Sequence, residues 1–178
     1  AAASDALTVF SAVNALPPGP SAVTAFAPWR NAAVYSDADG IHLLSPDDTA
    51  KTTLFGKQAD AIYVVHNLGL AVARLCKRKH GVVVLHLTAL GKAIVHRLPE
   101  TKRCEWLAVC QTSHKVVVSV KASLHVFDWV APAGAYVLDT RINLETAPSF
   151  VTFLSTGRLG LVVAGTYLIM HARTGKFV

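Results

Sequence analysis

Asp39-Gly40-Ile41-His42-Leu43-Leu44 is the first of four similar stretches in the sequence, each a turn followed by an apolar strand. The other three are His80-Gly81-Val82-Val83-Val84-Leu85, Lys121-Ala122-Ser123-Leu124-His125-Val126-Phe127 and Ala164-Gly165-Thr166-Tyr167-Leu168-Ile169-Met170. Their first strand residues, at positions 41, 82, 124 and 167, are separated by 41, 42 and 43 residues. A period of about 40 residues is typical of repeat architectures, in which each unit buries its apolar faces against the next.

The segments between these stretches predict the remaining strands of each repeat. They alternate apolar and β-branched residues and are bounded by Gly, Pro, Asn or Asp. Turn residues at 36–40 and 174–176 tolerate the positive φ that tight turns require. No long segment shows a helical period with caps. The sequence therefore predicts an all-β fold of about four blades, each a four-stranded antiparallel sheet, as in a β-propeller.

The repeat period also predicts the domain organisation. We expect a single partial β-propeller over residues 1–178, with an N-terminal strand and Pro-rich linker at 1–20 and blades at 21–56, 57–99, 100–144 and 145–178. Pro17-Pro18-Gly19-Pro20 cannot lie in a central strand. Propellers close with about four to eight blades, and the pattern stops within a repeat. We therefore expect the N-terminal part of a larger propeller.

Composition narrows the class of protein. Hydrophobic residues make up 52% of the chain but come in short runs, none near the roughly 18 residues that a membrane helix needs. The first residues lack the basic region of a signal peptide. Cys76, Cys104 and Cys110 are odd in number and match no zinc or CxxC spacing, which indicates free thiols in a reducing compartment.

A net charge of +6 favours an acidic partner, an anionic membrane or nucleic acid. The basic residues are dispersed, apart from Lys77-Arg78-Lys79 and Lys102-Arg103. Aromatic residues are not interleaved with them as a single-strand stacking platform requires, so we expect no nucleic-acid partner. These two basic clusters, with Trp29, Arg30 and Trp129 at strand ends, are the candidate residues for binding a partner or a membrane.

No catalytic or metal-binding constellation is predicted. Four histidines fall in or just after the third strand of successive repeats, without a recurring acidic ligand: His42, His86, His125 and His171. A histidine at a repeat position is more often structural than a ligand. Ser113-His114 and Ser123-Leu124-His125 are adjacent only in sequence, and the chain lacks a nucleophile elbow and a phosphate-binding glycine loop. We expect no enzyme activity and no cofactor.

The third repeat resembles the citron homology (CNH) domain. Val116-Val117-Val118-Ser119-Val120-Lys121-Ala122-Ser123-Leu124-His125-Val126-Phe127-Asp128-Trp129 is similar to that family's apolar strand, Val-Lys-x-x-Leu turn and aromatic-x-Trp strand. Ala147-Pro148-Ser149-Phe150-Val151, Gly165-Thr166-Tyr167-Leu168-Ile169 and Thr174-Gly175-Lys176 fit the following strands. The resemblance covers most of the chain, strand by strand.

The N-terminal half narrows this resemblance to the vacuolar-sorting tether subunits, which include the HOPS and CORVET end subunits and the TGF-β-receptor-associated protein. The similar segments are Leu16-Pro17, Val23-Thr24-Ala25-Phe26-Ala27-Pro28-Trp29 and Ala61-Ile62-Tyr63-Val64-Val65. This resemblance implies a cytoplasmic tethering module, peripheral to endosomal or vacuolar membranes, that recruits a Rab-type small GTPase or other tether subunits. The family has no shared catalytic residues, so the resemblance implies no catalytic residue in this chain.

Two other functions remain open from the residues alone. One is a generic propeller scaffold in another complex, because fold does not fix function. The other is association with anionic membrane through Lys77-Arg78-Lys79 and other basic loops. Neither the partner nor the binding face follows from the sequence.

Overall fold

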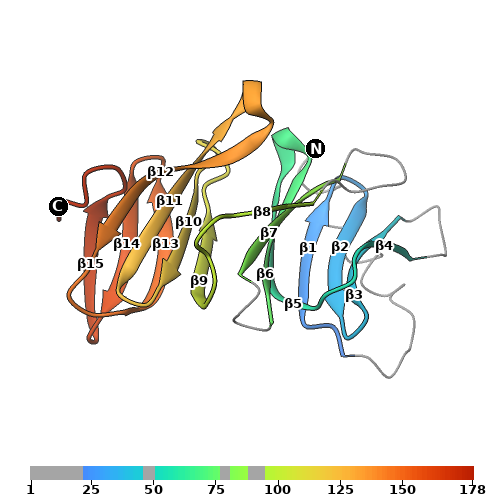
Figure 1. Cartoon of the computed structure of the whole chain (residues 1–178), viewed down its shortest axis with the longest axis horizontal. Coiled ribbons are helices and arrows are strands. Elements are labelled where there is room, and N and C mark those ends of the chain that lie inside the picture. Colours follow the sequence, from blue (N-terminus) through green and yellow to red (C-terminus); the bar gives the residue numbers. More distant parts are fainter. Residues whose placement is uncertain (1–21, 46–50, 77–80, 88–94) are drawn as a thin grey trace. The chain divides into compact units, whose positions relative to one another are not determined.

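The computed structural model describes residues 22–45, 51–76, 81–87 and 95–178. The expected N-terminal strand and Pro-rich linker at 1–20 and the basic cluster Lys77-Arg78-Lys79 lie outside these ranges. Nearly all regular secondary structure among the described residues is strand, as predicted for an all-β fold (Figure 1). Their only helices are the short 3-10 turns η1 (His66–Leu68) and η3 (Ala131–Ala133).

The strands form four meandering sheets in which neighbours in sequence are neighbours in space (Figure 1). The first sheet has the order β1-β2-β3-β4 and the second has the order β5-β6-β7-β8. Their strands are β1 (Ala25–Trp29), β2 (Ala32–Asp37), β3 (Gly40–Leu44), β4 (Thr52–Phe55), β5 (Ala59–Val65), β6 (Leu70–Leu75), β7 (Val82–His86) and β8 (Val95–Arg97).

The third sheet has the order β12-β11-β10-β9, and the fourth has the order β13-β14-β15. Their strands are β9 (Cys104–Val109), β10 (Val116–Val120), β11 (Ser123–Val130), β12 (Ala135–Asn143), β13 (Pro148–Ser155), β14 (Arg158–Val163) and β15 (Thr166–His171). Each blade was expected to have four strands, but the last strand of the fourth sheet is incomplete. It is reduced to an isolated antiparallel bridge between Met170 and Phe177.

The chain divides into two compact units. One consists of Ala1–Cys76 with Val83–Val95, and the other of Lys77–Val82 with His96–Val178. Each unit has an apolar core formed by alternate residues of its strands, since successive side chains of a strand point to opposite faces. The first core includes Val34, Ile41, Ala71, Val83 and Leu85.

The core of the second unit joins the third and fourth sheets. It is formed by Val117, Leu124 and Val126 together with Val151, Leu159, Leu161 and Met170. All but Val151 are at most 1% exposed. Burial of each such side chain contributes about 1.5–3 kcal/mol, so this packing fixes one face of the β13–β15 sheet against the third sheet.

Candidate interaction surfaces

Trp29 and Arg30 were candidate binding residues at a strand end, and they differ in exposure in the structure. Trp29 ends β1 and is only 8% exposed, so its ring belongs to the core of the first unit. Arg30 is exposed, with φ of 54°, and its guanidinium lies 5.1 Å from the centre of the Trp29 ring. A cation over an aromatic face is an attractive arrangement. Arg30 therefore covers Trp29 and offers its own outer side to solvent.

The other described candidates lie in the second unit. Lys102 and Arg103 are both exposed in the turn before β9, where Arg103 has φ of 65°. Trp129 is half-buried in β11, and its ring is 5.3 Å from that of Tyr136 in an edge-to-face contact. Trp129 therefore packs within its own sheet, whereas the Lys102–Arg103 turn is a small basic protrusion.

His42 is the centre of a buried polar network in the first sheet. Its Nε2 lies 2.8 Å from Oδ1 of Asp37, and its Nδ1 lies 3.1 Å from the Thr53 hydroxyl. The tautomer that satisfies both contacts donates from Nε2 and accepts at Nδ1. The hydrogen bonds from His42 to Asp37 and Thr53 link β3 to its neighbouring strands. His42 is completely buried, so its imidazole is not accessible to a substrate.

Asp37 also organises the β2–β3 turn. Its Oδ1 accepts hydrogen bonds from the backbone N–H of Asp39 and of Gly40, at 2.9 and 3.2 Å. Burial acts to raise the pKa of Asp37, but the His42 and Asp39 hydrogen bonds and nearby Lys51 hold it below its usual value. These interactions stabilise the turn.

Among the described residues no three His, Cys, Asp or Glu side chains are grouped to hold a metal ion.

The outer face of the β13–β15 sheet is an exposed apolar surface that sequence reasoning missed. Phe150, Leu154, Tyr167 and Ile169 are 43%, 55%, 85% and 43% exposed. They alternate along the strands with the buried residues of the opposite face. Gly160 lies beneath them and opens a hollow of about 260 Å³. The available signal was that residues 150–154 and 167–170 are apolar on both faces, which is typical of a strand covered on both sides.

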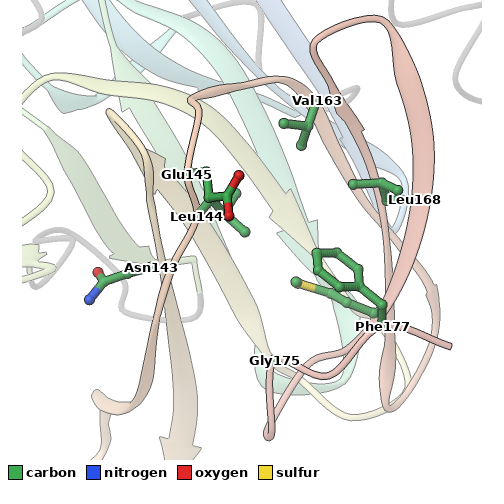
Figure 2. Close-up of a pocket in the computed structure, with 8 residues that line it drawn as sticks. Asn143, Leu144, Glu145, Val163, Leu168, Gly175 and Phe177 are labelled. Carbon is green, nitrogen blue, oxygen red and sulfur yellow. The ribbon is translucent and has the colours of Figure 1, made fainter.

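A groove lies in the second unit at the margin of its core (Figure 2). Its volume is about 400 Å³, and eight residues line it: Asn143, Leu144, Glu145, Val163, Leu168, Met170, Gly175 and Phe177. Figure 2 shows Leu144 and Glu145 next to each other on one side of the opening, with Leu168 and Phe177 on the other side. The groove is thus an apolar hollow with one acidic edge.

Comparison with known proteins identifies the architecture. The WD40 repeats of RRP9 align with a TM-score of 0.66 and 12% identity, over 92% of this chain and 52% of that one. Sqt1 of Saccharomyces cerevisiae gives a TM-score of 0.67 and 14% identity, over 90% and 48%. The sheets are blades of a β-propeller.

A third similar structure is the CNH domain of AfRom2, with a TM-score of 0.64 and 13% identity over 89% of this chain and 54% of that one. The expected CNH-type fold is thus compatible with the structure, but WD40 propellers resemble the chain as closely. The chain spans about half the length of these solved structures. No protein-family model and no curated protein sequence matches it. In the part of the chain that the structure describes, no helix is long and apolar enough to cross a bilayer.

Proposed function

We propose that this chain is a non-catalytic protein-interaction module of a vesicle-tethering factor, and that it recruits a Rab-type small GTPase. The observation that carries the interaction role is the outer face of the β13–β15 sheet, where Phe150, Leu154, Tyr167 and Ile169 are all exposed. Contiguous apolar side chains of this kind typically mark surfaces that bind another protein. Aromatic residues such as Tyr167 are favoured anchors in interfaces.

The tethering role is supported by the sequence resemblance to vacuolar-sorting tether subunits and by the likeness in fold to a CNH domain. The Lys102–Arg103 turn adds exposed positive charge in the same unit. Such charge at the rim of an interface raises the association rate with an acidic partner. We place the GTPase on the outer face of the β13–β15 sheet, with basic residues at the periphery.

A capture experiment with purified Rab-type GTPases tests this proposal. The immobilised chain is incubated with each GTPase loaded with GTP or with GDP, and bound protein is quantified. We expect GTP-selective capture by at least one GTPase, and its loss in Tyr167→Lys. Val137→Lys is the matched control, because Val137 is a 48% exposed apolar residue on β12. Absence of capture in both nucleotide states, or equal loss in both variants, would contradict the proposal.

A further inference from the structure

Three exposed cations lie at one end of the third sheet. Lys102 and Arg103 form the turn before β9, and Lys121 begins the turn between β10 and β11. Val120 pairs with Cys104, so the antiparallel ladder brings Lys121 beside Arg103 just beyond that pair. Among the described residues, none forms an ion pair with any of the three cations. The two turns therefore carry a compact basic patch of Lys102, Arg103 and Lys121.

Both turns place a cation where the backbone favours glycine. The N–H of Cys104 donates to the carbonyl of Thr101 at 3.1 Å, and Arg103, the third residue of this turn, has φ of 65°. Glycine is the usual residue where that position has a positive φ. Lys121 has φ of 54° at the first position of a two-residue hairpin turn, which also favours glycine. Because strain of this kind is concentrated at functional sites, binding explains these two cations better than stability does.

Both turns are held in place by hydrogen bonds to the rest of the unit. Thr101, which begins the first turn, is only 2% exposed. Its hydroxyl donates to the carbonyl of Leu98 at 2.8 Å and accepts from the N–H of Val82 at 3.0 Å. In the second turn, the carbonyl of Ala122 accepts from the N–H of Leu144 at 2.8 Å. A site that is pre-organised in this way binds a ligand without the entropic cost of ordering its loops.

Two carboxylates limit the extent of the basic patch. Glu100 precedes the first turn, and its carboxylate forms an ion pair with the guanidinium of Arg141. Glu145 is exposed and follows Leu144, which is bonded to the second turn. Anionic membranes are typically bound by clusters of about four to eight basic residues, whereas this patch has three, with acidic residues at its borders. A short acidic segment suits the patch better, because its carboxylates can contact the three cations and avoid Glu100 and Glu145.

We propose that this basic patch binds a short acidic segment of a partner protein. The planar guanidinium of Arg103 can hold one carboxylate through two parallel hydrogen bonds, and Lys102 and Lys121 supply point charges for neighbouring carboxylates. The net charge of +6 on the chain also attracts an acidic partner. The proposal deepens the proposed function by naming the chemistry of the partner, and it rests on that function only in treating the chain as an interaction module.

The test uses a fluorescent peptide that contains Asp-Glu-Asp-Glu flanked by Gly and Ser, titrated against the purified chain by fluorescence anisotropy at low ionic strength. We expect saturable binding that weakens as salt is added and is lost when Asn and Gln replace the acidic residues. Arg103→Gln with Lys121→Gln should weaken binding about three- to tenfold. Arg158→Gln with Arg173→Gln is the matched control, because it also removes two exposed cations, one at the start of β14 and one just after β15.

Glycine variants separate binding from folding. Arg103→Gly with Lys121→Gly should weaken binding as much as the glutamine variant does. Its midpoint of urea denaturation should not fall, because glycine adopts a positive φ without steric strain. No saturable binding, binding insensitive to both double variants, or equal weakening in the control would overturn the proposal.

Vesicles rich in phosphatidylserine provide the alternative ligand, and co-sedimentation measures their binding. We expect no vesicle binding that depends on Arg103 and Lys121. Vesicle binding that these substitutions abolish, without any binding of the acidic peptide, would assign the basic patch to a membrane and overturn the proposal. No GTPase is present in either assay, so failure of this proposal is distinguishable from failure of the capture experiment.

Discussion

His42 and His125 occupy related repeat positions, yet their environments differ. Both rings are buried, but His42 has a hydrogen-bond partner at each nitrogen. Nδ1 of His125 is buried and has no partner among the described residues. The charged groups that act on His125 are Arg141, which lies opposite it on β12, and Glu100. A buried imidazole beside an arginine is stable only in its neutral form.

This environment predicts a pH-dependent stability. Burial and Arg141 lower the pKa of His125, and Glu100 only partly offsets them. The unfolded chain therefore binds a proton at His125 at a higher pH than the folded chain does. The free energy of unfolding should be fully developed above the ordinary histidine pKa of about 6.5 and should fall as the pH drops below it.

Urea unfolding at a series of pH values from neutral to mildly acidic measures this dependence. His125→Leu removes the titrating group and keeps an apolar side chain at a buried strand position. We expect the stability of this variant to vary less with pH over that interval than the stability of the original chain. Equal slopes in the two proteins would show that other groups cause the loss.

At the scale of the elements, the β2–β3 hairpin depends on a close backbone approach. Gly40 has φ of 149°, and a Cβ placed on it would lie 2.2 Å from the carbonyl oxygen of Phe55, at the end of β4. The Asp37 carboxylate holds the same turn through the N–H of Gly40. The turn and the neighbouring strand therefore leave no room for a side chain at this position.

Gly40→Ala should destabilise the chain by about 2–4 kcal/mol, since it adds backbone strain and a steric overlap. Gly134 is the matched control, because its φ is also positive, at 57°, but a Cβ there would contact nothing within 4 Å. Gly134→Ala should cost only about 1 kcal/mol. Chemical denaturation of both variants gives the comparison. Similar losses would mean that the contact with Phe55 relaxes without cost.

The strands were largely predictable because their signal is local. Alternation and turn residues placed β6 at Leu70–Leu75 and β10 at Val116–Val120, where the structure has them. The tight turn of the first hairpin was not predictable: β1 and β2 pair up to Trp29 and Ala32. Arg30 adopts a positive φ in the turn between these strands. The residue type of an arginine does not predict this conformation.

At the scale of the whole molecule, the repeat period predicted blades, but it could not predict the groove. The groove combines Leu144 and Glu145, which follow the third sheet, with Val163, Leu168 and Phe177 from the fourth. Their proximity depends on how two sheets pack, and that information is not contained in the spacing of a motif. Likewise, the position of Trp29 at a strand end made it a candidate for binding, but its burial depends on packing that the sequence does not specify.

The exposed apolar face of the β13–β15 sheet should also govern how the purified chain behaves at high concentration. In the absence of its partner, apolar side chains such as Leu154, Tyr167 and Ile169 favour contact with other copies. We expect concentration-dependent self-association in sedimentation velocity. Because the attraction is hydrophobic, sulfate should strengthen it, whereas an association driven by charge would weaken as salt is added.

The double variant Tyr167→Lys with Ile169→Lys tests whether this face is responsible. It should remain monomeric at concentrations where the original chain associates, with little change in unfolding midpoint, because both side chains are exposed and neither belongs to the buried core. Val137→Lys changes an exposed apolar residue on β12 and should leave association unchanged. Persistent association of the double variant would locate the contact elsewhere and remove the main physical reason for assigning a protein partner to this face.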